Sequence, residues 1–160
     1  MAYQKLQAGL AVDVIPSDTI NIPVPNVTIS GTSIATSSPT SKLKSTTSDF
    51  IEANVKAGDT VYNTSTTGIA KVVQVEDANT IVLTADIFNV GNQSFAVYSS
   101  MDHPNQGCVL YVGGAGDLAV VTSSGSEVTL VGVLAGSFIP VQVLRVEATN
   151  TTATNIVALW

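Results

Sequence analysis

The chain has 160 residues, of which 45% are hydrophobic and only 11% are charged, and its formal net charge is −6. An acidic chain lacks the basic footprint that nucleic-acid binding requires, so we expect no nucleic-acid partner. Gly, Pro, Ser and Thr interrupt the apolar runs, which argues against a membrane helix. The first residues have no long apolar stretch, which argues against a secretory signal and favours synthesis in a cytoplasm.

Serine, threonine and valine dominate the composition, with 16, 19 and 23 residues respectively. β-Branched residues suit a pleated, half-buried surface, so this usage predicts an all-β fold. A charged fraction below the ~25% of ordinary soluble domains favours a protein that buries much of its surface against neighbours.

The first quarter of the chain predicts short extended segments. Leu10–Ile15 is a predicted strand, and Ile20–Val24 with its prolines is either an edge strand or an arm, since proline removes a ladder donor. Two further short strands are predicted near Val27–Ser30 and Ser41–Lys44. Asp49–Asn54 then has a weak capping-box pattern, which predicts one helical turn with Phe50 and Ile51 pointing inward.

Turn residues recur every 8–12 residues after that point, which is typical of a small sandwich or barrel. The strands predicted in the middle of the chain are Thr60–Asn63, Ile69–Glu76, Thr80–Thr84 and Ser94–Ser99. Met101–Gln106 is a predicted polar linker. The strands predicted after it are Cys108–Val112, Leu118–Thr122, Glu127–Val131, Val141–Glu147 and Ile156–Leu159. Gly113–Asp117 and Ser123–Gly125 are predicted hairpin turns.

Several segments together resemble small all-β virion proteins of tailed phages, above all the head-spike base proteins of phages and gene-transfer agents. The segments are VDVIPSD (12–18), LYVGGAGDLAVVT (110–122), VTLVGVLAGSFIPVQVLRV (128–146) and ATNTTATNIVALW (148–160). In that family the first motif runs almost directly into the LYVG strand, whereas here residues 26–101 lie between them. This departure predicts a base domain of residues 1–25 plus 102–160, interrupted by an inserted β-barrel-like domain of residues 26–101.

The resemblance implies a non-enzymatic structural protein on the capsid surface of a virion, either a decoration or cement protein or a head-spike base. It implies homo-oligomers, a trimer or pentamer, that also contact other virion proteins, the major capsid protein first. A small base domain with a marginal core favours such association on physical grounds as well. Two alternatives remain open: a tail or baseplate adaptor, and a carbohydrate-binding receptor module. Tyr98, Tyr111, Phe138 and Trp160 are the aromatic residues that could stack on a sugar, although Tyr111 and Phe138 are expected to pack in a core.

Residues that could carry chemistry are scarce, so we expect no enzyme, cofactor or metal site. His103 lies in the polar linker with no nucleophile motif, and one His with one Cys cannot supply a zinc ligand set. Cys108 is expected to be a buried small hydrophobe, and as the single cysteine it excludes an internal disulfide. Glu76, Asp77 and Asp86 lack calcium-loop spacing and are expected to be solvated turn residues.

Both ends of the chain are candidate interface segments. Trp160 follows an apolar strand, and large aromatic residues are common anchors of interfaces. Residues 1–7 are expected to form an arm that adds a strand to a neighbour. The predicted interface residues are Trp160, Leu159, Tyr3, Leu6 and Leu10.

Overall fold

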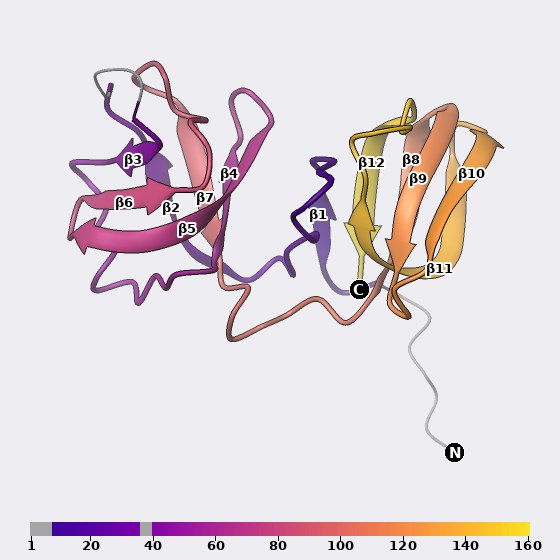
Figure 1. The fold of residues 1–160 in the computed structure, drawn as a ribbon, viewed down its shortest axis with the longest axis horizontal. Coiled ribbons are helices and arrows are strands. Elements are labelled where there is room, and N and C mark those ends of the chain that lie inside the picture. Colours follow the sequence, from indigo (N-terminus) through magenta and orange to yellow (C-terminus); the bar gives the residue numbers. More distant parts are fainter. Residues whose placement is uncertain (1–7, 36–39) are drawn as a thin grey trace. The chain divides into compact units, whose positions relative to one another are not determined.

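The computed structural model describes residues 8–35 and 40–160, and these form an all-β fold (Figure 1). The described residues contain twelve strands and no helix, and the strands make two separate six-stranded antiparallel sheets. The chain divides into two compact units, each with one sheet. We call Met1–Pro25 with Asn105–Trp160 the base unit, and Asn26–Pro104 the inserted unit.

The base unit holds a sheet with the strand order β1-β12-β8-β11-β9-β10. Its inward side chains, among them Leu110, Val120 and Val143, are fully or almost fully buried. The strands are β1 (Ala11–Asp13), β8 (Cys108–Gly114), β9 (Gly116–Thr122), β10 (Glu127–Val133), β11 (Ser137–Val146) and β12 (Thr154–Leu159).

One strand, β11, curls this sheet by pairing with two different neighbours. Its first half lies against β8, with Phe138 opposite Tyr111, and its second half lies against β9, with Val146 opposite Val120. The register with β8 shifts between Ile139 and Val143, around Pro140, which has no N–H to donate. The curl wraps the apolar side chains of both halves around one core.

The segment between β1 and the inserted unit is an arm and not an edge strand. Its Ile22 N–H donates to Leu144 O (2.9 Å), and Ile20 and Ile22 are buried. Asp18 fastens the arm further, because its carboxylate accepts the Thr149 N–H and the Thr149 hydroxyl, each at 2.8 Å. The hydrogen bond from the Thr149 N–H, and next that from the Thr149 hydroxyl, stabilise the carboxylate and lower the pKa of Asp18 below its ordinary value.

The inserted unit holds the second sheet, with the order β2-β7-β4-β5-β6-β3. The sheet curls until the segment after β2 meets β3, where the Ile34 N–H donates to Lys44 O (2.8 Å). Phe50, Phe88 and Phe95 are fully or almost fully buried inside it. The strands are β2 (Val27–Thr32), β3 (Lys42–Lys44), β4 (Thr60–Asn63), β5 (Gly68–Asp77), β6 (Thr80–Leu83) and β7 (Ser94–Tyr98).

The predicted helical turn at Asp49–Asn54 is a hydrogen-bonded turn, and half of the predicted side-chain pattern is wrong. Asp49 caps it, since its Oδ1 accepts the N–H groups of Ile51 (3.0 Å) and Glu52 (2.9 Å). Phe50 is buried, but Ile51 is exposed. Consecutive residues of a single turn point in different directions, so only one of the two reaches the core.

The inserted unit ends at Pro104. The boundary predicted from the sequence lies three residues earlier, between Met101 and Asp102. Both of these residues are bound to the inserted unit. Asp102 forms an ion pair with Lys56 (2.8 Å), and the Met101 N–H donates to Asp59 Oδ1 (3.4 Å). The buried carboxylate of Asp59 also accepts the Lys56 N–H (2.8 Å), so it holds the outgoing chain against a turn of the same unit.

One of the two predicted glycine turns is a hairpin and the other is not. Residues 123–126 join the paired strands β9 and β10, with Gly125 at a φ of 84°. Gly113–Asp117 instead links β8 to β9, which both pair with β11 and not with each other. The hairpin prediction for Gly113–Asp117 is therefore wrong, because a strand from elsewhere in the chain occupies the place between them.

Gly116 allows the chain to pass close to the segment before β12, which gives a test of this corner. A Cβ at Gly116 would lie 2.6 Å from the Thr152 carbonyl carbon and 2.8 Å from Ala153 Cα, and main chain cannot move aside as a side chain can. We expect Gly116→Ala to lower the free energy of unfolding by about 1–3 kcal/mol, as overpacking does. Chemical denaturation measures this change. Gly9→Ala is the control, since nothing lies within 4 Å of its Cβ position, and an equal loss in the control would contradict the explanation.

Candidate assembly interface

The most exposed apolar side chains of the base unit belong to β10, to the loop after it and to the first half of β11. Val131 is 80% exposed, Leu134 73% and Phe138 66%. Val128 and Val141 are exposed as well. We call these five residues the β10 patch. Single exposed apolar residues are ordinary, but several within one stretch of chain, residues 128–141, favour an interaction surface.

The patch exists because β10 is the last strand of its sheet and neither of its faces is covered. Every residue of β10 is exposed or half-buried, although four of its seven side chains are Val or Leu. A strand with one face on a core alternates buried and exposed residues, and β10 does not. Its apolar side chains are therefore available to another surface.

The main chain of β10 is also available along the outer edge. Thr129 lies opposite Ala119 of β9. The Ala119 N–H donates to Thr151 Oγ1 (3.0 Å) and its carbonyl accepts the Glu147 N–H (2.9 Å), so both groups point away from β10. In an antiparallel pair the facing residue then directs its own groups outward as well. Thr129 thus offers a donor and an acceptor to a further strand.

A bulge ends the regular pairing of β10 at Gly132, which has a φ of 67°. Its N–H donates to Asp117 Oδ1 (2.8 Å). Glycine tolerates this left-handed conformation, and the bulge re-aims the residues on either side of it. Val131 and Leu134, which flank the bulge, are among the most exposed apolar residues of the chain.

Phe138 does not pack in the core, contrary to the prediction from the sequence. Ile139 takes the inward position of β11, and Phe138 faces outward across from Tyr111, with ring centroids 5.3 Å apart and planes tilted by 58°. Tyr111 is half-buried between the inward-facing Leu110 and Val112. The two rings form an outward-facing aromatic pair across β8 and β11.

The predicted interface residues that the structure describes lie together at the opposite edge of the same sheet. The Trp160 N–H donates to Leu10 O (3.0 Å), and Trp160 O accepts the N–H groups of Gly9 (2.6 Å) and Leu10 (3.3 Å). Leu159 lies opposite Ala11. Leu10 is exposed, while Leu159 and Trp160 are half-buried. Tyr3 and Leu6 lie outside the described residues.

The residues considered for chemistry are mostly engaged in structural contacts. Glu76 forms an ion pair with Lys42 (2.7 Å), and Asp77 Oδ1 accepts the Asn79 N–H (2.8 Å). His103 is exposed in the linker, as predicted. Tyr98 is buried in the inserted unit, whereas the other three aromatic residues considered for sugar stacking belong to the base unit. Within the described ranges, no three His, Cys, Asp or Glu side chains gather as a metal site would require.

Cys108 is a buried small side chain, as predicted. Its Sγ donates to Val143 O (3.2 Å), and only 1% of the residue is exposed. Burial raises the pKa of the thiol to about 12, because a thiolate would lose its hydration there. A thiol held neutral and covered is not a nucleophile.

Comparison with known proteins adds no relative: no family model, no curated protein and no solved structure matches the chain. Residues 8–35 and 40–160 contain no helix that is long and apolar enough to cross a membrane.

Sequence reasoning missed the β10 patch, although a signal for it was present. The run VTLVGVLAGSF places apolar residues at adjacent positions, so both faces of any strand formed there must be apolar. Such a run is typical of a strand covered on both sides. Nothing in the sequence indicates that this strand ends a sheet, which leaves the same side chains uncovered.

The state of Cys108 gives a second testable prediction. At pH 8 we expect the folded protein to react with a disulfide reagent such as Ellman's reagent at least 100-fold more slowly than the denatured chain, because the buried thiol is neutral. The absorbance of the released thiolate measures the rate. A folded protein that reacts as fast as the chain in guanidinium chloride would show that β8 opens readily.

Proposed function

We propose that this chain is a non-enzymatic structural protein of a tailed-phage virion, which decorates or cements the capsid surface or forms the base of a head spike. The observation that carries the proposal is the β10 patch, an uncovered apolar strand on the unit whose sequence resembles head-spike base proteins. A tail or baseplate adaptor would use the same surface, and the position of the chain in a virion distinguishes the two.

Energetic considerations support association through this patch. Burying a Val, Leu or Phe side chain that is now exposed contributes about 1.5–3 kcal/mol. The patch contains five such residues, two of which are more than 70% exposed. Low charge helps, because few ionic groups must lose their hydration when surfaces meet.

The arrangement of the sheet supports assembly as a ring. Strand β10 lies at one edge of the base sheet, while β1, with Leu10 and the main chain of Trp160 beside it, lies at the other. Two different edges of one sheet permit head-to-tail contacts between copies, which close into a ring when the rotation between copies allows it. We therefore expect a trimer or pentamer of base units that contacts the major capsid protein.

The β10 patch gives a direct test of assembly by this chain alone. We expect light scattering to give a mass of three or five copies for the purified protein and a lower mass for Val131→Asp, because a carboxylate at the contact would lose its hydration. A concentration series should show the apparent affinity between copies falling by about 10-fold or more.

Val90→Asp is the matched control for that experiment, since Val90 is an exposed apolar residue of the inserted unit. It should leave the mass unchanged. Circular dichroism and thermal melting of both variants separate loss of assembly from loss of fold. A wild-type mass that Val131→Asp does not change would contradict a role for the patch in self-association.

The N-terminal arm is a separate part of the proposal. Deleting residues 1–8 should weaken assembly and incorporation into particles without changing the melting temperature by more than a few degrees, because an arm that pairs with a neighbour contributes nothing to the fold of its own copy. Particle incorporation of the deletion variant equal to that of the full chain would refute this role.

A further inference from the structure

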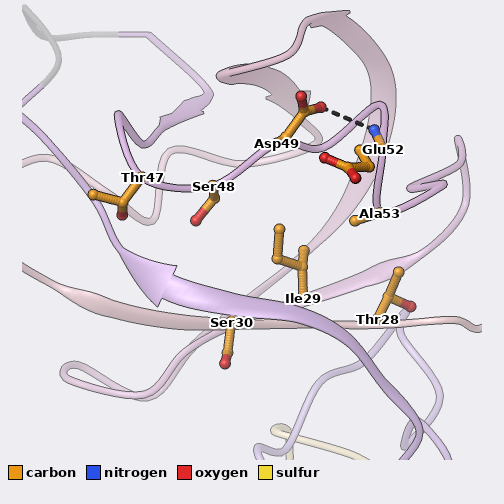
Figure 2. Close-up of a pocket in the computed structure, with 8 residues that line it drawn as sticks. All are labelled: Thr28, Ile29, Ser30, Thr47, Ser48, Asp49, Glu52 and Ala53. Atoms are coloured by element: carbon orange, nitrogen blue, oxygen red, sulfur yellow. Dashed lines mark hydrogen bonds between the residues drawn. The ribbon is translucent and has the colours of Figure 1, made fainter.

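The inserted unit contains a groove that the proposed assembly does not use (Figure 2). It has a volume of about 370 Å³ and runs between β2 and the turn that Asp49 caps. Thr28, Ile29 and Ser30 line it from β2. The residues that line it from the turn are Thr47, Ser48, Asp49, Glu52 and Ala53. All eight belong to one unit, so the groove is complete within it.

The groove lies where the curled sheet is not closed. β2 is an end strand, which pairs with β7 alone. The two ends of the sheet meet where Ile34 bonds to Lys44, but no strand of the described chain covers β2 at Thr28–Ser30. Closure of a barrel removes such edges, and here it stops short.

Ser30 presents an unused donor and acceptor at this edge. It lies opposite Ala96 of β7. Ser94 of β7 accepts the N–H of Thr64, just after β4, at 2.9 Å. Main-chain groups of an antiparallel strand alternate in direction with a period of two residues, so the N–H and C=O of Ala96 also point towards β4 and away from β2. The N–H and C=O of Ser30 therefore point away from β7, on the side of β2 that no described strand covers. An extended peptide would pair with them as an added strand.

The turn side of the groove is acidic. Asp49 uses one oxygen, Oδ1, to cap the turn, and the carboxylate of Glu52 is exposed. No Lys, Arg or His is among the lining residues. Figure 2 shows both carboxylates at the turn across the groove from β2, with that of Asp49 pointing away from the strand. A strand added along β2 would run past this acidic turn, with the exposed carboxylate of Glu52 beside it.

Ser48 supplies a further group with unused capacity. It is 5% exposed, and its hydroxyl accepts a bond from Ser45 Oγ (3.1 Å), while its own hydrogen has no acceptor within residues 8–35 and 40–160. Gly31 lies directly beneath it, because a Cβ at Gly31 would be 2.6 Å from Ser48 Oγ. A hydroxyl can donate as well as accept, so Ser48 can still donate to an acceptor of a bound main chain.

We propose that this groove binds an extended segment of another protein, which adds a strand to the edge of β2 and carries a lysine or arginine opposite Asp49 and Glu52. Main-chain bonds to Ser30 hold the segment, and the two carboxylates select its basic residue. The inference does not rest on the proposed virion role, since it uses only contacts within the inserted unit.

The test is a titration of the full-length ¹⁵N-labelled protein, followed by NMR, with two pools of acetylated, amidated heptapeptides. One pool has lysine at the centre and the other glutamate, and in both the remaining positions are drawn from Ser, Thr and Val. The lysine pool should shift the amide signals of residues 28–31 and 47–53 in a saturable way. The glutamate pool should bind at least five-fold more weakly, and added salt should narrow the difference.

Two variants of equal charge change make the experiment specific. Glu52→Lys should weaken binding of the lysine pool about five-fold or more, while Asp86→Lys, an exposed acid of the same unit outside the groove, should not. Equal weakening by both variants would mean a general effect of net charge and would overturn the proposal. Equal binding of the two pools, or no shifts at millimolar peptide, would also overturn it.

A third peptide tests whether the segment that binds the groove comes from another protein or from a second copy of this chain. Residues 1–7, MAYQKLQ, contain Lys5 and lie outside the described part of the chain. We expect this peptide to bind more weakly than the lysine pool. Tighter binding of MAYQKLQ, together with loss of assembly in the deletion variant, would assign the groove to the arm of a neighbouring copy and overturn the partner proposed here.

Discussion

The base unit depends on the way β11 divides its hydrogen bonds between β8 and β9. The first half of β11 pairs with β8 and its second half pairs with β9. Strands β8 and β9 are consecutive in the sequence, yet they lie on either side of β11. The sheet must curl to make this possible, and the curl encloses Leu110, Val120 and Val143. The arm before the inserted unit adds its bond from Ile22 to Leu144 on the same strand. Loss of β11 would therefore open the core, release the arm and separate β8 from β9.

Both sheets leave ends uncovered, and these ends are where function is expected. In the base unit the uncovered strand, β10, is apolar on both faces and offers main-chain groups at Thr129. In the inserted unit the uncovered strand, β2, borders a polar groove with two carboxylates. Natural proteins commonly protect sheet edges with charges, prolines or covering segments. Edges that lack such protection are suited to binding, the first to an apolar surface and the second to a basic strand.

Both units supplement strand pairing with carboxylates that accept main-chain N–H groups. In the base unit, Asp18 accepts the Thr149 N–H and Asp117 accepts the Gly132 N–H. The inserted unit holds its ends with a buried carboxylate, Asp59, and the ion pair between Lys56 and Asp102. Residues 101–104 are part of the inserted unit, so the contacts that hold its outgoing segment lie within that unit.

The sequence by itself determined the all-β class, the positions of most strands and the state of Cys108. These features depend on local periodicity, on turn residues and on the hydrophobicity of a strand, which are all readable along the chain. The tertiary structure alone decided which strands are neighbours, and so which face of a strand is covered. For that reason Gly113–Asp117 is not a hairpin, Phe138 faces outward and Ile51 is exposed. The β10 patch and the β2 groove follow from the same cause: an edge is a property of the sheet, set by contacts between residues far apart in sequence.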